Sequence, residues 1–303
     1  MCYNHASWVE ASIQSVLNQQ YDPIELIVVD DGSTDNSRDV IANLAAEYGF
    51  QTFFNGENIG NCKTFNKALA LLKGDYIIDL AADDVLLPDR IGRGVWVFGE
   101  VDDDFAVHFC DVALIGPEGE DLGTHYKRNA DGNLLEEVPA GDVYLDVLER
   151  YFISTPSMMM SRRALQALGG YDESLSYEDF DFWVRASRNF KFAFTDDILV
   201  QKRILPGSMS ESQKEYKNVH LISTAKVCQK AQKMNHSRDE DIALANRCKY
   251  ELKWALVTEN WEAAGMLRNI LKQINIKPVI YHLAGLVILL KPAWYRLWKM
   301  FFH

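Results

Sequence analysis

The sequence lacks the features of a zinc protein, a disulfide-bonded protein or a membrane-spanning protein. Its five cysteines are scattered, without a Cys-x-x-Cys pair or a matching histidine spacing, so neither a zinc site nor a disulfide framework is expected. The start of the chain is polar and has no apolar segment of the signal-peptide type. The longest strongly apolar run, residues 279–290, is shorter than the roughly 20 residues that a spanning helix needs. We therefore expect a protein of the reducing cytoplasm.

Positive charge is also scarce in this sequence. The chain has 31 Lys and Arg against 43 Asp and Glu, which gives a net charge of −12 and a pI near 5.1. A nucleic-acid-binding protein normally carries a basic face, so no nucleic-acid partner is expected. Some of the carboxylates could instead hold a divalent cation that binds a phosphate. With 303 residues, 48% of them hydrophobic, the chain can form one large domain with an appendage, or two domains.

Hydrophobic spacing predicts alternating strands and helices in the first part of the chain. Helices are expected over residues 6–19, 33–48 and 63–72, and strands over 25–29, 51–54 and 76–80. Further along we expect a strand over 105–115, a loop or hairpin over 116–138, and helices over 142–151, 162–168 and 178–189. Such alternation is typical of βαβ units and parallel strands. The fold class predicted is therefore α/β, with a mixed, mainly parallel sheet flanked by helices over residues 1–213 and a helical region over 214–303.

Two pairs of acids directly follow two of the predicted strands. Asp30 and Asp31 come after the strand over residues 25–29, and Asp83 and Asp84 follow the strand over 76–80. Ligands of open α/β sheets bind at the carboxyl ends of the strands, so both pairs are expected at a binding crevice. The alternative is that each pair only forms a turn or caps a helix. Two pairs in equivalent positions favour the crevice.

Several motifs in this order resemble glycosyltransferase family 2, the inverting enzymes of GT-A fold. The resemblance covers roughly residues 1–210 and is carried by the following strings: Tyr3-Asn4-His5, Val28-Val29-Asp30-Asp31-Gly32-Ser33, Asn58-Ile59-Gly60, Gly74-Asp75-Tyr76-Ile77, Asp83-Asp84 with Pro88-Asp89, Gly169-Gly170-Tyr171-Asp172, and Glu178-Asp179-Phe180 with Trp183. The resemblance implies transfer of a sugar from a nucleotide donor to a hydroxyl acceptor.

The resemblance also implies the roles of the residues on the donor side. Asp31 would accept a hydrogen bond from the nucleotide base, with Tyr3 and Asn4 near the same base and ribose. Asp83 would contact the ribose or the sugar, and Asp84 would bind Mg²⁺ or Mn²⁺. A hard cation of this kind needs one or two carboxylates together with the phosphates of the substrate. It would neutralise charge that builds on the departing diphosphate.

Further residues are expected near the acceptor and the phosphates. By resemblance, Asp179 takes the position of the general base, which removes the acceptor's proton during inversion, with Glu178 beside it. The alternative for Asp179 is an acid that stabilises a helix N-terminus. Trp183 stacks on a sugar in one interpretation and belongs to the core in the other. Asn66 is expected near the ribose or phosphates.

The sequence departs from the family pattern at two places. Relatives usually begin with a strand of the type Val-Ser-Val-Ile-Ile-Pro, and Met1 stands here where the proline would be. The sheet is therefore expected to lack a central row, either through truncation or in a damaged form. The second place is Leu205, where the family often has a histidine near the metal or diphosphate. Arg203 could compensate by pairing with the diphosphate.

The end of the chain is basic and aromatic. After Glu262 no acid follows, whereas six Lys and Arg do. Trp294, Leu297, Trp298 and Phe301 share one face of a predicted helix. One interpretation is an interfacial helix on an anionic membrane, with the enzyme on the inner face of the cytoplasmic membrane. The other is a helix packed against the protein.

We expect an inverting transferase that uses a UDP-sugar, or a dTDP-sugar as second choice, and that acts on a glycan or lipid-linked glycan of a surface polysaccharide. Two alternatives stay open at this point. A non-catalytic nucleotide-sugar-binding protein would fit the missing strand and Leu205. A nucleotidyltransferase would share the acidic metal site, but it normally has a glycine-rich phosphate loop that is not found here.

Overall fold

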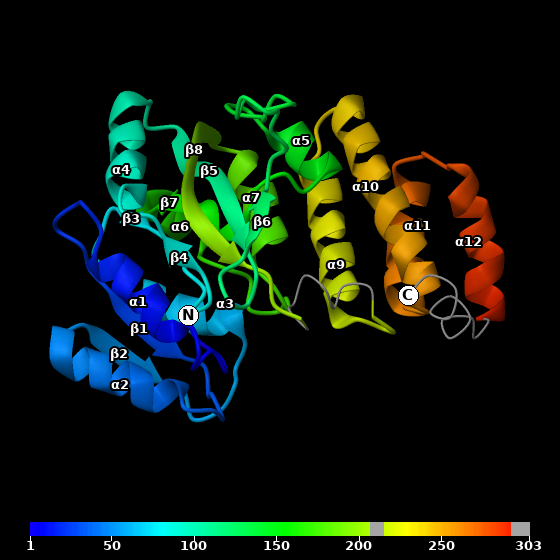
Figure 1. Ribbon diagram of the computed structural model, residues 1–303. Coiled ribbons are helices and arrows are strands. Elements are labelled where there is room, and N and C mark those ends of the chain that lie inside the picture. Colours follow the sequence, from blue (N-terminus) through cyan, green and yellow to red (C-terminus); the bar gives the residue numbers. More distant parts are fainter. Residues whose placement is uncertain (207–214, 292–303) are drawn as a thin grey trace. The chain divides into compact units, whose positions relative to one another are not determined.

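The computed structural model describes residues 1–206 and 215–291 (Figure 1). The chain forms two compact units. The first comprises residues 1–142, 152–173 and 189–205, and the second comprises 143–151, 174–188 and the residues from 206 onward. The second unit thus takes in two helices that the sequence assigned to the first domain, as well as the expected helical region.

The first unit contains all the described strands and five α-helices. The strands are β1 (Ile27–Asp30), β2 (Gln51–Phe54), β3 (Tyr76–Ile77), β4 (Val85–Leu86), β5 (Phe105–Ile115), β6 (Asp121–Thr124), β7 (Met159–Ser161) and β8 (Lys191–Arg203). The helices are α1 (Val9–Leu17), α2 (Ser37–Tyr48), α3 (Asn61–Leu69), α4 (Arg90–Glu100) and α6 (Arg162–Leu168), with a short 3₁₀ turn η1 (Thr155–Ser157).

The strands form two separate sheets. β1 and β2 make a parallel pair in which Ile27 lies opposite Gln51. The second sheet has the order β3-β7-β5-β8-β4, with β6 paired to β5. Its centre is the parallel pair of β5 and β8, the two longest strands, which lie side by side in Figure 1. Most residues of β5 are buried, as expected for a strand covered on both faces.

The α/β class with a mixed sheet is confirmed, but parallel pairing is less general than predicted. Among the described strands only β1–β2 and β5–β8 are parallel, whereas β3, β4, β6 and β7 pair antiparallel with their neighbours. These four strands are short. Of their antiparallel pairs, only β5–β6 has a short connection, whereas β3–β7, β5–β7 and β4–β8 join segments that lie far apart in the sequence.

Met1 and Cys2 lie between β1 and the segment that follows β3. The N–H of Cys2 donates to the carbonyl of Val29 at 2.9 Å, and Cys2 forms a parallel bridge with Asp30. On the other side, the N–H of Ala82 donates to the carbonyl of Met1 at 2.9 Å. The start of the chain therefore joins the two sheets by a single short stretch of extended backbone.

The second unit is helical throughout its described residues. Its helices are α5 (Tyr144–Glu149), α7 (Asp179–Ser187), α9 (Val219–Met234), α10 (Arg238–Val257), α11 (Trp261–Gln273) and α12 (Val279–Leu290). α10 packs against α5, α9, α11 and α12, so it forms the centre of the unit (Figure 1). Ser237 and Glu240 form a capping box at its start, which satisfies N–H groups that the helix itself leaves unpaired.

Several predicted elements agree closely with the structure. The strands over 51–54 and 105–115 and the helix over 162–168 coincide with β2, β5 and α6. The strand predicted over 76–80 is paired only at Tyr76 and Ile77, because no described strand lies along its other edge. β8 and α4 were not predicted. Asp196 and Asp197 interrupt the apolar pattern of β8, and three glycines weaken the helical pattern of α4.

Candidate active site

The acids Asp83 and Asp84 lie in the loop between β3 and β4, at one end of the first unit's sheet. Asp84 is only 4% exposed, yet it sits next to a second carboxylate. Burial and the neighbouring charge of Asp83 raise the pKa of Asp84 to about 7. Two adjacent carboxylates repel each other when both are ionised, so together they favour the binding of a cation.

Arg203, the last residue of β8, connects this loop to the end of β5. Its backbone N–H donates to Oδ1 of Asp84 at 2.9 Å, and its Nε donates to the carbonyl of Asp83 at 3.1 Å. Its Nη1 donates at 2.9 Å to the carbonyls of Gly116 and Pro117, which follow β5. The guanidinium thus bonds mainly to backbone carbonyls. The proposed contact of Arg203 with a diphosphate stays a prediction.

The residues present fit a divalent cation. Among the described residues, no hydrogen bond reaches Oδ2 of Asp84, and the side chain of Asp83 is 16% exposed. Such an ion needs few protein ligands when the substrate supplies phosphate oxygens. Within the described residues there is no cluster of three or more His, Cys, Asp or Glu that would hold an ion by itself. The donor set is therefore of the kind that completes its coordination with substrate.

Asp31 follows β1 and is 5% exposed. Its Oδ1 accepts hydrogen bonds from Asn55 Nδ2 at 2.8 Å, Thr64 Oγ1 at 2.9 Å and the Ile59 N–H at 3.0 Å. Its Oδ2 accepts only the N–H of Gly60, at 2.9 Å. A carboxylate has about four acceptor positions, so a base N–H would have to use the remaining capacity of Oδ2. Asp31 also holds the loop that precedes α3.

The loop after β1 requires glycine at position 32. Gly32 has φ +80°, and a Cβ there would lie 2.4 Å from the carbonyl carbon of Glu57. A side chain at this position would push apart the two loops that Asp31 connects. The string Asp30-Asp31-Gly32 is therefore explained by local geometry as well as by the family resemblance.

Tyr3 and Asn4 extend from the short bridge at the start of the chain. Tyr3 is 44% exposed, so its ring is open to a ligand. Asn4 has φ +57°, its N–H donates to Ser33 Oγ at 2.8 Å, and its Oδ1 accepts the N–H of Thr34 at 2.8 Å. The structure thus brings Asn4 together with the loop that carries Asp31, as the predicted shared base and ribose contact requires.

Asn66 on α3 has its amide engaged by a neighbouring segment. Its Nδ2 donates to the carbonyl of Tyr171 at 2.9 Å and to Glu173 Oε1 at 3.0 Å, and its Oδ1 accepts the Tyr171 N–H at 2.9 Å. At Gly170, with φ +74°, a Cβ would lie 2.4 Å from that same Oδ1. The Gly169-Gly170-Tyr171 motif is thereby placed against α3. Contact of Asn66 with ribose or phosphate stays a prediction.

Asp179 and Glu178 lie at the N-terminus of α7, in the second unit. Both are partly exposed, and Asp179 Oδ1 accepts the N–H of Phe180 at 2.6 Å. Burial raises the pKa of Tyr177, and the negative charge of Asp179 raises it further. Asp179 thus lies near a buried phenol that stays protonated. A helix-capping role and a role as base are both compatible with this position.

Trp183, also on α7, is 3% exposed and packs edge-on against Tyr151 with ring centroids 6.0 Å apart. This burial agrees with the core interpretation of Trp183. Stacking on a sugar would need an exposed ring face, so this function stays a prediction that the observed packing does not favour.

His5 was not singled out in the sequence, although it lies at the candidate site. Its Nδ1 is 3.5 Å from Oδ1 of Asp83, within ion-pair range but without a hydrogen bond. Its backbone N–H donates to Ser37 Oγ at 3.0 Å. The only available signal was its place directly after Tyr3 and Asn4. The seven histidines do not cluster along the sequence, so none was assigned.

The comparison with known proteins decides the family. The sequence profile described as Glycosyl transferase family 2 matches residues 1–169, more than half of the chain. The chain belongs to glycosyl transferase family 2. The predicted family is thus confirmed. Membership in a glycosyl transferase family supports glycosyl transfer and favours neither of the two alternative functions.

Relatives of this chain include proteins of Rickettsia. An uncharacterized glycosyltransferase of Rickettsia prowazekii is 29% identical over 204 residues, which cover 67% of this chain and 61% of the relative. One of Rickettsia felis is 28% identical over 203 residues, which cover 66% of this chain and 33% of the relative. The chain therefore spans between about a third and three fifths of the length of these relatives.

Solved structures with the same fold are glycosyltransferases of low sequence identity. TarS 1–349 of S. aureus, solved in complex with UDP-GlcNAc, gives a TM-score of 0.71 at 15% identity, covering 95% of this chain and 85% of that one. The mannosyltransferase PcManGT of Pyrobaculum calidifontis, in complex with GDP-Man and Mn²⁺, gives 0.58 at 16% identity, covering 99% and 81%. These similarities establish that this chain has the GT-A fold.

Within residues 1–206 and 215–291, no helix is long and apolar enough to cross a bilayer. The aromatic face predicted for residues 294–301 lies outside the described residues.

Proposed function

We propose that this glycosyltransferase transfers a sugar from a nucleotide-diphosphate donor, a UDP-sugar first, to a hydroxyl acceptor with inversion at the anomeric carbon. The observation that carries the proposal is the pair Asp83 and Asp84, with the pKa of Asp84 raised to about 7 at a partly exposed strand end. A buried carboxylate of this kind is costly unless a cation joins it. UDP-GlcNAc in TarS and GDP-Man with Mn²⁺ in PcManGT support a nucleotide sugar with a divalent metal.

The donor would be held by residues of the first unit. Tyr3 offers an exposed ring on which a base can stack, and Asp31 offers the remaining acceptor capacity of Oδ2 to a base N–H. Uracil has such an N–H, so a uridine donor suits a carboxylate better than a base without one. Asp83 and Asp84 would hold Mn²⁺ or Mg²⁺, which would offset the charge on the departing diphosphate.

The acceptor would be activated by Asp179. In an inverting reaction the acceptor oxygen attacks the face opposite the leaving group, and a carboxylate removes its proton as the bond forms. The proton passes from the acceptor hydroxyl to the Asp179 carboxylate, and the electron pair of the breaking glycosidic bond leaves on the diphosphate. Glu178 lies beside Asp179 and would help to orient the acceptor. We further propose that the acceptor is a glycan, free or lipid-linked, of a surface polysaccharide.

A lipid-linked acceptor would bring the protein to an anionic membrane surface. α12 has a row of exposed apolar side chains at helical spacing, with Val279 77%, Leu283 58%, Leu286 59% and Leu289 79% exposed. No acid follows Glu262, and Lys277 and Lys291 lie just before and after α12. Exposed leucines with flanking cations suit insertion at the headgroup level of an anionic bilayer. We therefore propose this face of α12 as a peripheral membrane contact.

Release of nucleotide tests the proposed reaction. The protein is incubated with UDP-, dTDP- and GDP-sugars, with Mn²⁺, with Mg²⁺ and with EDTA, and the released nucleotide is measured. We expect turnover or slow hydrolysis of a UDP-sugar that depends on the metal. Binding of the nucleotide sugar without any release, even with a broad acceptor panel, would favour a non-catalytic binding protein. Release that EDTA does not affect would contradict the metal assignment.

A further inference from the structure

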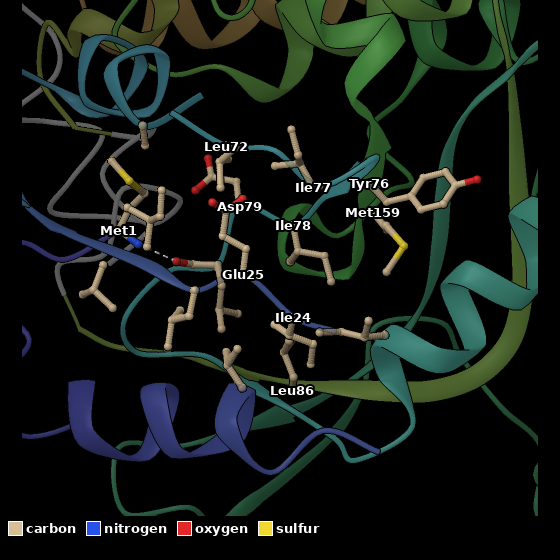
Figure 2. Close-up of a pocket in the computed structure, with 18 of the residues that line it drawn as sticks. Met1, Ile24, Glu25, Leu72, Tyr76, Ile77, Ile78, Asp79, Leu86 and Met159 are labelled. Atoms are coloured by element: carbon tan, nitrogen blue, oxygen red, sulfur yellow. Dashed lines mark hydrogen bonds between the residues drawn. The ribbon is translucent and has the colours of Figure 1, made fainter. Parts of the chain in front are cut away.

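The proposed base Asp179 belongs to the second unit, whereas the residues proposed to hold the donor belong to the first. The cavity of about 340 Å³ that Figure 2 shows is lined by residues of the first unit, among them Met1 and Tyr76, and Asp179 is not one of them. Asp179 lies instead in a segment, residues 174–181, that contacts α9 within the second unit. α9 packs against α7, the helix that begins at Asp179 (Figure 1).

Two side chains of α9 bond to Ser176, three residues before Asp179. The Ser176 N–H donates to Oγ of Ser223 at 3.0 Å. Its hydroxyl oxygen lies 2.8 Å from Nδ1 of His220 and 2.9 Å from Oγ of Ser223. Both the backbone and the side chain of Ser176 are therefore bonded to the same turn of α9, at a site where Ser223 is buried.

Tyr177, two residues before Asp179, is bonded to α9 through hydroxyl groups whose direction is fixed. Its hydroxyl lies 2.6 Å from Oγ1 of Thr224, and this Oγ1 donates to the carbonyl of His220 at 3.0 Å. A threonine hydroxyl has one hydrogen, so Thr224 accepts in the first contact and Tyr177 donates. The hydrogen of the Tyr177 hydroxyl is thus used by Thr224 and is not available to the carboxylate of Asp179.

An ion pair bonds α9 to the segment on the other side of Asp179. Asp181 is 1% exposed and accepts hydrogen bonds from Nε of Arg185, at 2.6 Å, and from Nζ of Lys230 on α9. Loss of either cation would leave a buried carboxylate with less compensation, so the pair strongly favours one position of this turn. α9 therefore bonds to the segment at positions 176, 177 and 181, on both sides of the proposed base.

The side chain of Asp179 itself stays partly exposed between these bonded positions. Its Oδ1 accepts the N–H of Phe180, and the N–H of Phe182 donates to the carbonyl of Glu178 at 2.9 Å, so the carboxylate is part of the first turn of α7. A general base acts only in the right geometry, and a displacement of about 1 Å can slow a reaction roughly 100-fold. Contacts that hold the turn therefore also set the reactivity of its carboxylate.

We propose that α9 positions the base of the transfer reaction, with Thr224, Ser223 and His220 as positioning residues that hold the segment carrying Asp179. Both α7 and α9 lie beyond residues 1–169, the part of the chain that the family profile matches. The helical second unit would thus contribute to the acceptor step through a contact that the family assignment does not cover. This inference rests on the proposed function of Asp179.

Threonine-to-valine substitutions at two sites test the proposal. Thr224→Val removes the acceptor of the Tyr177 hydroxyl and keeps the shape of the side chain. Thr258→Val is the matched control, because Thr258 is also buried in the second unit and its Oγ1 also donates to a carbonyl four residues earlier, that of Trp254, at 2.9 Å. Each variant loses one buried hydroxyl, so a similar fall in melting temperature is expected for the two.

The rate of nucleotide release should separate the two variants. It is measured with Mn²⁺ and with the UDP-sugar that the wild type turns over fastest. Thr224→Val should lower kcat by about 10- to 100-fold and leave the KM for the donor and the affinity for UDP unchanged. Thr258→Val should leave kcat unchanged. Thr224→Ser, which keeps the hydroxyl, should restore most of the rate, and Ser223→Ala should lower kcat as Thr224→Val does.

Amide exchange tests the contact without any turnover. The N–H groups of Ser176 and Phe182 report on the bond to α9 and on the first turn of α7. Both should exchange with deuterium at least about 10-fold faster in Thr224→Val than in the wild type, and at the wild-type rate in Thr258→Val.

The results that overturn the inference differ from those that overturn the proposed function. Unchanged exchange in Thr224→Val, or faster exchange with an unchanged kcat, would contradict positioning by α9 and leave the proposed function intact. An equal fall of kcat in both valine variants would assign the effect to stability, and a loss of UDP affinity that matches the loss of kcat would place it on the donor side. An unchanged rate in Asp179→Asn, or no release of nucleotide by the wild type, would contradict the proposed function and the inference together.

Discussion

The backbone N–H of Arg203 donates to the carboxylate of Asp84 across 119 positions of sequence. The side chain of the same arginine holds the carbonyl of the adjacent Asp83. The position of the acid pair is thus set by the end of the longest strand of the sheet.

Substitution of Arg203 separates a positioning role from phosphate binding. Arg203→Ala should remove the contacts to Asp83, Gly116 and Pro117 and weaken Mn²⁺-dependent UDP binding by about 10- to 100-fold, the scale for residues that orient a metal ligand. UDP binding in EDTA should stay nearly unchanged. Calorimetry with and without Mn²⁺ makes the comparison, and Arg93→Ala, which breaks an exposed ion pair with Asp197, is the control. Equal weakening with and without metal would assign Arg203 to the diphosphate.

Asp84→Asn should abolish metal-dependent turnover of donor while the protein stays folded. The substitution keeps the shape of the side chain and the acceptor for the Arg203 N–H, but it removes the charge that a cation needs. Nucleotide release with Mn²⁺ and the melting temperature are measured together. Full activity of the variant would show that Asp84 does not hold the metal.

The raised pKa of Asp84 makes the metal-free protein sensitive to pH. The folded carboxyl has a pKa of about 7, above the value near 3.9 in an unfolded chain. Between these values the folded state binds more protons, so the contribution of Asp84 to the free energy of unfolding falls as pH rises from about 4 to 7. The melting temperature of Asp84→Asn should therefore exceed that of the wild type at pH 8, and the difference should vanish at pH 4. Addition of Mn²⁺ at pH 8 should raise the melting temperature of the wild type but not that of the variant. A constant difference across this range would contradict the assigned pKa.

Substitutions of Asp31 and Asp179 should affect different steps, nucleotide binding for Asp31 and sugar transfer for Asp179. Asp31→Ala removes the acceptor for four protein donors and for the base, so UDP binding should weaken. Asp179→Asn should leave UDP affinity nearly unchanged and slow transfer by roughly 10²-fold or more. Calorimetry with UDP and steady-state rates test the pair. An equal loss of UDP affinity in both variants would exclude an acceptor-side role for Asp179.

The exposed face of α12 should determine membrane binding. Leu283→Glu combined with Leu286→Glu should release the protein from vesicles that contain phosphatidylserine, while the melting temperature stays constant because both side chains are more than half exposed. Leu122→Glu, at a side chain that is 50% exposed on β6, is the matched control. Wild-type binding should weaken with salt, because attraction to an anionic surface is screened over about 10 Å at 0.1 M.

Removal of residues 292–303 completes this test. If the tail anchors the protein, the truncated form should leave the vesicles and still turn over donor with a soluble acceptor. Loss of stability on truncation, together with no vesicle binding by the full chain, would support the packed helix instead.

The sequence was a good guide to local elements and to the acids that follow them. The spacing around β1 predicted the pair Asp30 and Asp31 at its end, because that signal lies within a few residues. Asp83 and Asp84 instead lie in the loop after the short β3 and directly before β4. It could not predict that Asp31 would bond to Asn55 and Thr64, since those donors lie 24 and 33 residues away. The local sequence also could not predict that Trp183 packs against Tyr151, because it fits both interpretations of Trp183, stacking on a sugar and packing in the core.

β8 shows most clearly why the rest was missed. Its interior contains Asp196 and Asp197, which bond to Arg128 and Arg93, so two charges interrupt an otherwise apolar strand. Partners at this separation, 68 and 104 residues, leave no signature in a local window. The strand exists because its pairing with β5 outweighs its unfavourable local composition.

The register between β5 and β8 has a consequence for how this sequence tolerates change in length. Cys110 lies opposite Thr195 and Val112 lies opposite Val200, so β8 accommodates three residues more than β5 over this interval. Removal of these three extra residues would make the pairing regular and leave Arg203 opposite Ile115, where its backbone N–H reaches Asp84. A deletion of three residues within positions 196–199 should therefore leave the acid pair and metal-dependent turnover in place.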